Sequence, residues 1–248
     1  MRAIRVAALL ACCLCGPIMA QDDPGSPEVR YPQLPASGGT VQAFVPDGWT
    51  IEFQQAGDLS KDGRDDLVLV LRMQDPANVV ENEGLGVSEF DTNPRLLAVL
   101  FADAAGGYRL ALQDHALIPR PDNPVMDDYL GDGESIQVRR GAFTVTLRSW
   151  ASAGTWYTSS TTFTFRHQDG CFRLIGHDST WMHRGSGETG TTSLNFAAGK
   201  GVFEEGTMES DAPTRTKTVS IPRGELPCLE DIGNGFEFDP GVKSPFND

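Results

Sequence analysis

Asp58, Ser60 and Asp62 place three oxygen-bearing side chains at alternate positions of one short segment, and Gly63 follows them directly. Calcium is a hard cation that takes six to eight oxygen ligands. A tight loop meets that demand when it presents an oxygen at every second residue and bends sharply at a glycine. The spacing therefore predicts a calcium-binding loop, with an acidic turn that holds no ion as the alternative.

Two later residues complete the predicted ligand set. Arg64 offers its backbone carbonyl, and Asp66 supplies a further carboxylate at the ninth position of the loop. An EF-hand would need a glutamate at the twelfth position and a helix on each side. Leu69 occupies that position and both flanks have the composition of strands, so the EF-hand is excluded.

The segment GDLSKDGRDDLVLV, residues 57–70, resembles the calcium loop of the FG-GAP and VCBS repeats, which has the form gDldgDGrdDlvv. The resemblance covers one copy, about residues 49–113, and includes the strand pair LLAVLFADAAGGYRLAL. Propellers of this family contain several copies. A single copy therefore implies one calcium hairpin within a different β fold.

The resemblance also implies roles for individual residues. Asp58, Asp62 and Asp66 match the family's ligands, and Arg64 matches the position that contributes a carbonyl. Ser60 stands where the family has Asp or Asn, so it implies a weaker ligand or one that acts through water. The implied cofactor is Ca²⁺, bound in the weak range of extracellular sites.

The first twenty residues have the features of a secretory signal peptide. Arg2 and Arg5 precede an apolar run, VAALLACCLC, and Ala20 is a small residue of the kind that a signal peptidase needs. We therefore expect a periplasmic or secreted protein. Lipoprotein processing at Cys12 is an alternative, but it would leave only a short apolar run ahead of the cut. No later apolar run reaches the roughly 18 residues of a membrane-spanning helix, so no transmembrane segment is expected.

The chain is acidic, with 34 Asp and Glu against 20 Lys and Arg and a net charge of −14 at pH 7. Nucleic-acid binding depends on neutralising phosphates with Lys and Arg, so this class of function is excluded. The same negative field opposes binding to anionic membrane surfaces and favours cations.

Removal of the expected signal peptide leaves two of the five cysteines, Cys171 and Cys228. An even count in an exported protein predicts a disulfide between them. The alternative, a catalytic thiolate, would need a reducing site and a dedicated base.

Residues 21–39 contain four prolines and read as a flexible leader. From residue 40 the hydrophobic pattern has mostly a period of two, so residues 40–248 are expected to form one all-β domain with few or no helices. Its sheets should be mostly antiparallel, as a sandwich, an open barrel or a partial propeller. The possible halves are 40–118 and 134–248.

Within this domain, one apolar segment lacks alternation and should be buried on both faces, residues 67–73. Two long connections are candidates for functional loops, residues 74–94 and 119–133. Other expected strands in the first half are 40–45, 49–56, 95–102 and 107–113.

Three further patterns contain residue types that could carry chemistry. The spacing of His167, His177 and His183 fits no zinc pattern, and the sequence around Ser186 lacks a nucleophile elbow. The aromatic residues Trp150, Trp156, Tyr157 and Trp181 fit either a hydrophobic core or a binding surface, and the core is the commoner outcome.

The sequence therefore predicts an exported, non-enzymatic protein that binds an unknown protein or carbohydrate and carries a structural calcium hairpin. The alternative is a hydrolase that acts on envelope carbohydrate or peptide, with calcium in a supporting role. The sequence contains no defensible set of catalytic residues, which favours the binding protein.

Overall fold

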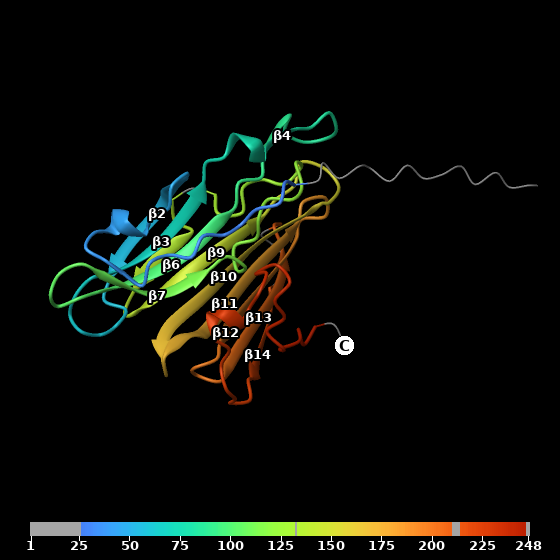
Figure 1. Ribbon diagram of the computed structural model, residues 1–248. Helices are drawn as coiled ribbons and strands as arrows, with labels where there is room; N and C mark the ends of the chain where they lie inside the picture. Colours follow the sequence, from blue (N-terminus) through green and yellow to red (C-terminus); the bar gives the residue numbers. More distant parts are fainter. Residues whose placement is uncertain (1–25, 132, 210–213, 247–248) are drawn as a thin grey trace, which may run out of the picture.

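The computed structural model describes residues 26–131, 133–209 and 214–246, and within them the protein is all-β, as predicted. A five-stranded and a seven-stranded sheet, both antiparallel, pack against each other, and a separate two-stranded hairpin lies beyond one end (Figure 1). The expected signal peptide, residues 1–20, lies outside the described residues. No helix in the described ranges is long and apolar enough to cross a membrane.

The five-stranded sheet has the strand order β1-β7-β6-β3-β2. Its members are β1 (Ser37–Gly38), β2 (Trp49–Gly57), β3 (Asp66–Met73), β6 (Arg95–Ala102) and β7 (Tyr108–Asp114). The central strands β3 and β6 have almost every side chain buried, on both faces of the sheet. This confirms the expectation for the unalternated apolar run.

The seven-stranded sheet is a meander in which the strand order follows the chain, from β8 at one edge to β14 at the other. Each strand pairs only with its neighbours in sequence, through antiparallel ladders. The strands are β8 (Ile136–Arg139), β9 (Ala142–Ser149), β10 (Tyr157–Gln168), β11 (Cys171–His183), β12 (Glu188–Asn195), β13 (Lys200–Thr207) and β14 (Arg215–Ser220).

The main hydrophobic core lies between the two sheets. Val68, Val70 and Val99 face it from the five-stranded sheet, and Phe143 and Phe165 face it from the seven-stranded sheet. Burial of such side chains contributes roughly 1.5–3 kcal/mol each. One core therefore joins strands from both sides of the connection at residues 119–133.

A second cluster covers the opposite face of the five-stranded sheet, where Leu69, Leu71 and Leu96 pack against Leu34 and Phe44. Phe44 belongs to a short 3-10 helix, η1 (Val41–Phe44), so the strand expected at residues 40–45 is wrong. The turn places Val41 and Phe44 on one side, where both contact this cluster. Contact with the sheet overrides the β-propensity of the segment.

The connection expected at residues 74–94 contains secondary structure of its own. A 3-10 turn, η2 (Pro76–Asn78), leads into a short hairpin of β4 (Val79–Glu81) and β5 (Glu89–Asp91). The connection at 119–133 has no strand in its described residues. It contacts this hairpin, because the Val87 amide donates a hydrogen bond of 3.0 Å to the Pro124 carbonyl.

The predicted disulfide between Cys171 and Cys228 is confirmed. It ties the start of β11 to η3 (Leu229–Asp231), beside a backbone bridge between Arg173 and Cys228. The bond thereby holds a C-terminal segment in which Leu229 and Ile232 enter the main core.

We predict that a Cys171→Ser/Cys228→Ser variant unfolds more easily by about 4 kcal/mol. The bond spans 57 residues, and on the chain-entropy model a loop of that size restricts the unfolded chain by about this amount. Urea denaturation of the oxidised protein and the variant measures the difference. Reductant should destabilise the wild type to the same level and leave the variant unchanged. Equal stability of oxidised wild type and variant would contradict the prediction.

Candidate functional site

The predicted calcium loop joins β2 to β3. Its backbone coils tightly, because Lys61 and Gly63 both have positive φ angles, of 64° and 84°. Asp58 closes the coil by accepting hydrogen bonds from the amides of Asp62 (3.1 Å) and Gly63 (3.0 Å). The loop therefore wraps around the carboxylate at its first position.

Asp66 anchors the other end of the loop and is fully buried. One carboxylate oxygen accepts from the amides of Leu59 (2.9 Å) and Ser60 (2.7 Å), and the other accepts from the Ala102 amide (2.9 Å). These contacts satisfy a buried carboxylate with three backbone donors. They also fix the loop to the end of β6.

The remaining predicted ligands differ in their surroundings. Asp62 forms a partly exposed ion pair with Arg64, whose Nε also donates to the Ala102 carbonyl at 3.3 Å. The Ser60 hydroxyl oxygen is buried and has no hydrogen-bond partner among the described residues. In the part of the chain that the structure describes, no group of three or more Asp, Glu, His or Cys side chains is arranged to hold a metal ion.

The loop lies where the two sheets meet. The turn between β8 and β9 contacts it, because a Cβ atom at Gly141 would lie 3.6 Å from the Asp58 carbonyl. At Gly57 a Cβ atom would lie only 2.6 Å from Val138 of β8, so this position requires glycine. The conformation of the loop therefore affects how the two sheets pack against each other.

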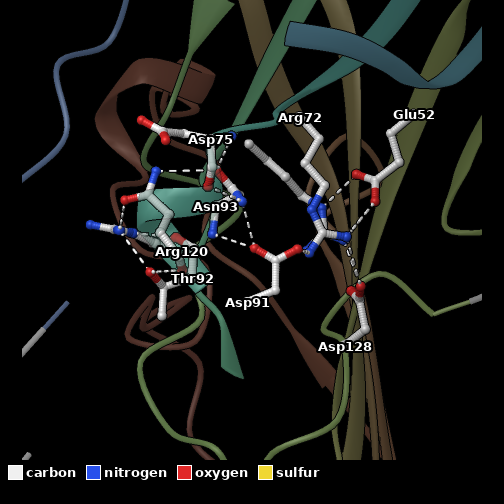
Figure 2. Close-up of polar contacts among 10 residues, drawn as sticks. Glu52, Arg72, Asp75, Asp91, Thr92, Asn93, Arg120 and Asp128 are labelled. Atoms are coloured by element: carbon white, nitrogen blue, oxygen red, sulfur yellow. Dashed lines mark hydrogen bonds and ion pairs between the residues drawn. The ribbon is translucent and has the colours of Figure 1, made fainter. Parts of the chain in front are cut away.

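A second polar group, a network of charged side chains, lies at the opposite ends of β3 and β6. Arg72 and Arg95 are directly opposite each other in register, an arrangement of like charges that is destabilising by itself. Three carboxylates surround them and offset the repulsion. Figure 2 shows Glu52, Asp91 and Asp128 pointing toward Arg72.

Arg95 is the most deeply placed member, with a side chain that is 1% exposed. It binds Glu52 through two hydrogen bonds, of 2.6 and 2.8 Å, and Asp128 through one of 2.6 Å. Burial acts to lower the pKa of Arg95, but these two carboxylates outweigh it and raise the pKa. Burial would likewise raise the pKa of Asp128, yet the hydrogen bond and charge of Arg95 hold that pKa below its usual range.

Neutral groups extend the network along the connection between β3 and β6. The Asn93 side chain accepts from the Asp75 amide (3.0 Å) and donates to Asp91 (2.7 Å), and Arg120 binds Thr92 and Asn78 (Figure 2). Arg72 and Arg95 thus bind the carboxylates of this region, Arg120 binds neutral groups, and together these contacts fix the β4–β5 hairpin. The arrangement is that of a structural brace.

The aromatic residues of the second sheet are not in the core, contrary to the commoner outcome expected from sequence. Trp156 is 64% exposed, Tyr157 52% and Trp150 37%. Trp181 covers the backbone of β12, where a Cβ atom at Gly190 would lie 2.3 Å from its indole nitrogen. The four side chains lie on or beside the β9–β10 turn and the ends of β11 and β12.

This aromatic surface is held in place by Arg184. Its guanidinium stacks 4.9 Å over the Trp150 ring and donates to the carbonyls of Ala151 and Thr155, each at 2.8 Å. The backbone amide of Arg184 donates to the Trp156 carbonyl at 2.8 Å. One arginine thus connects the turn before β10 to the turn after β11.

A serine and a histidine meet in that second turn, where Ser186 Oγ lies 2.9 Å from His183 Nδ1. The Ser186 amide also donates to this nitrogen, at 3.0 Å, and Glu188 accepts from the serine hydroxyl. In a catalytic triad the acid binds the histidine and the histidine acts as base toward the serine. Here the three side chains close an exposed turn of six residues.

The other histidines are accounted for by packing. His177 is buried against Phe163 and Phe238, and this burial lowers its pKa. His167 packs edge-on against Phe101.

Comparisons of the chain with protein families, with curated proteins and with solved structures find no match.

Sequence reasoning missed the charge network. Arg95 and its partners Glu52 and Asp128 are far apart in the chain, so no local spacing connects them. The available signal was Arg95 itself, a charge at the start of a run of apolar residues that had to be buried.

We predict that Arg95→Met lowers the free energy of unfolding by about 3 kcal/mol. Breaking a buried ion pair typically costs 3–5 kcal/mol, and the lower end applies because Glu52 and Asp128 still reach water. Urea denaturation measures the change. Arg30→Met, which replaces an exposed arginine, should shift stability by less than about 0.5 kcal/mol. A loss below about 1 kcal/mol in Arg95→Met would show that the network is not a brace.

Proposed function

We propose that this chain is an exported, non-enzymatic binding protein and that Trp150, Trp156 and Tyr157 form part of its binding surface. The observation that carries the proposal is the exposure of these three rings at one end of the seven-stranded sheet. Aromatic residues and arginine are enriched at interfaces, where they supply most of the binding energy. Export rests on the signal sequence expected at residues 1–20, which favours the periplasm or the medium.

The fixed geometry of this surface supports the same proposal. Arg184 binds three carbonyl groups of the surrounding turns, so the backbone that carries Trp150 and Trp156 is braced before any ligand arrives. Rings held in advance lose less conformational entropy on binding. An exposed tryptophan on a backbone without such contacts would support a binding role less strongly.

The alternative is a hydrolase of envelope carbohydrate or peptide. The contact between Ser186 and His183 is the observation that favours it. Its chemistry supports it poorly, because Glu188 binds the serine and the Ser186 amide occupies the histidine nitrogen that would have to act as base. The binding protein is therefore the better-supported proposal.

We further propose that residues 49–113 contain a single FG-GAP or VCBS-like hairpin whose loop binds Ca²⁺ through Asp58, Ser60, Asp62, Arg64 and Asp66. The buried Ser60 hydroxyl without a partner supports a ligand inside the loop. Asp58 and Asp66 already hold the loop closed through backbone amides, so calcium would add stability to a formed loop. To bind the ion, Asp62 would have to break its ion pair with Arg64.

Binding through the aromatic surface predicts that the purified protein sediments with isolated cell envelopes of its source cells and that Trp156→Ala/Tyr157→Ala abolishes this. The two substitutions remove the most exposed rings and leave the core intact, so the variant should keep the wild-type melting temperature. Sedimentation followed by quantification of bound protein measures the effect.

The matched control is Ala105→Ser in the β6–β7 turn, at the end of the five-stranded sheet away from the β4–β5 hairpin. It should sediment like the wild type. If the wild type and the double variant sediment with the envelopes in equal amounts, the proposed function is rejected. Release of envelope fragments by the wild type, abolished in Ser186→Ala, would establish the hydrolase instead.

Calcium binding predicts a higher melting temperature in 5 mM Ca²⁺ than in EDTA. For a Kd of 10⁻⁴ to 10⁻³ M, calcium would stabilise the native state by about 1–2 kcal/mol, or roughly 2–8 °C for a chain of this size. Asp62→Ala should lose the response. Asp65→Ala, which replaces an exposed acid of the same loop outside the ligand set, should keep it. Identical midpoints in calcium and EDTA would leave the loop as an acidic turn.

A further inference from the structure

The exposed aromatic surface continues onto other segments as a larger apolar end. Three large aliphatic side chains that would ordinarily be buried are also among the most exposed in the described residues. Two of them lie in the β4–β5 hairpin and one follows β13. The apolar end consists of Leu85 (64% exposed), Val87 (52%), Trp150 (37%), Trp156 (64%), Tyr157 (52%) and Met208 (66%).

The β4–β5 hairpin is fixed against the connection at residues 119–133. The Val87 amide donates to the Pro124 carbonyl at 3.0 Å. Gly86 has a φ of 102°, and a Cβ atom there would lie 2.1 Å from the Pro124 oxygen. The close approach at a glycine places Leu85 and Val87 beside this connection.

The same connection is fixed to the turn that carries the tryptophans. The Asp127 amide donates to the Trp150 carbonyl and the Ser152 amide to the Val125 carbonyl, each at 2.9 Å. Figure 1 shows the β4 hairpin and the turn before β10 at the same end of the molecule. The connection therefore joins the aliphatic and aromatic parts of the apolar end.

Met208 extends this surface to the end of β13. Its amide donates to the Gly187 carbonyl at 2.8 Å, in the turn that also holds Arg184. Contacts between successive segments thus run from the hairpin to the end of β13. Monomeric proteins rarely expose large contiguous apolar surfaces unless these bind something.

Exposed acidic side chains lie on the segments that form the apolar end, where Arg184 is the cation stacked on Trp150. The hairpin between residues 79 and 91 contains four acids and no Lys or Arg, and three of these acids are exposed, namely Glu81, Glu83 and Glu89. Asp127 and Glu188 are exposed on the adjoining segments. With a net charge of −14 on the whole chain, the local and long-range fields have the same sign.

From this combination we propose that the apolar end binds a protein partner whose surface presents basic side chains around an apolar centre. The inference rests on the proposed binding function and specifies its partner. Complementary charge steers the two surfaces together and excludes acidic competitors. The aliphatic side chains favour a protein over a carbohydrate as the partner, namely Leu85, Val87 and Met208. Flexible aliphatic side chains bury well against apolar side chains, whereas sugars stack on flat rings.

The test uses three synthetic 14-residue peptides with identical Leu and Phe positions and with Lys, Gln or Glu at all other positions. A neutral oligosaccharide, chitohexaose, is the fourth probe. Each is titrated into the mature protein by calorimetry at 50 and 300 mM NaCl. The Lys peptide should bind saturably with 1:1 stoichiometry and at least tenfold more tightly than the Gln peptide, and its affinity should fall several-fold at the higher salt.

Variants then locate the binding. Leu85→Ser and Trp156→Ala should each weaken the Lys peptide at least tenfold, and Glu81→Gln/Glu83→Gln should weaken it several-fold at 50 mM NaCl. Two controls at the opposite ends of the sheets should bind like the wild type: Ala105→Ser, and Asp103→Asn/Asp169→Asn, which removes the same amount of charge.

Two outcomes would overturn the inference in different ways. Equal affinity for the Lys and Glu peptides, or equal losses in the control variants, would reject a basic protein partner at this surface. Binding of chitohexaose alone, lost in Trp156→Ala, would reject a protein partner while retaining the proposed function. Failure of the proposed function itself would appear separately, as unchanged envelope retention in Trp156→Ala/Tyr157→Ala.

Discussion

Burial of β3 and β6 on both faces is the constraint on which the rest of the structure depends. Their aliphatic side chains need cover on two sides, and the seven-stranded sheet can supply only one of them. The other comes from the segment that contains Leu34 and η1, which crosses the outer face. Polar groups are consequently confined to the strand ends. There each must be satisfied locally, since an unpaired buried charge costs several kcal/mol.

Two solutions to that problem appear at opposite ends of the same strand pair. Asp66, the first residue of β3, is satisfied by backbone amides and needs no counter-charge. Arg95, the first residue of β6, faces Arg72 and recruits carboxylates from β2 and from the connection at residues 119–133. The first solution orders the acidic loop. The second orders the segments that present the apolar end.

The sequence was sufficient for features that depend on local pattern. Apart from Arg72 and Arg95, residues 67–73 and 95–102 are apolar and form the buried strands, and two cysteines in an expected exported chain form the disulfide. It was insufficient where tertiary contacts decide. The segment at 40–45 has the composition of a strand but turns to bury Phe44. Likewise, aromatic composition alone does not distinguish a core residue from Trp156, whose exposure depends on where the β9–β10 turn lies.

The order of strands in the two sheets also has a consequence for folding kinetics. Every pairing in the seven-stranded sheet joins strands that are adjacent in sequence, so its contacts are local and should form early. The five-stranded sheet is complete only when β1 pairs with β7, which lies far along the chain. Closing that long loop costs conformational entropy. Until the loop closes, the outer faces of β3 and β6 stay exposed. We therefore expect the N-terminal segment to determine how long the folding chain remains prone to aggregation.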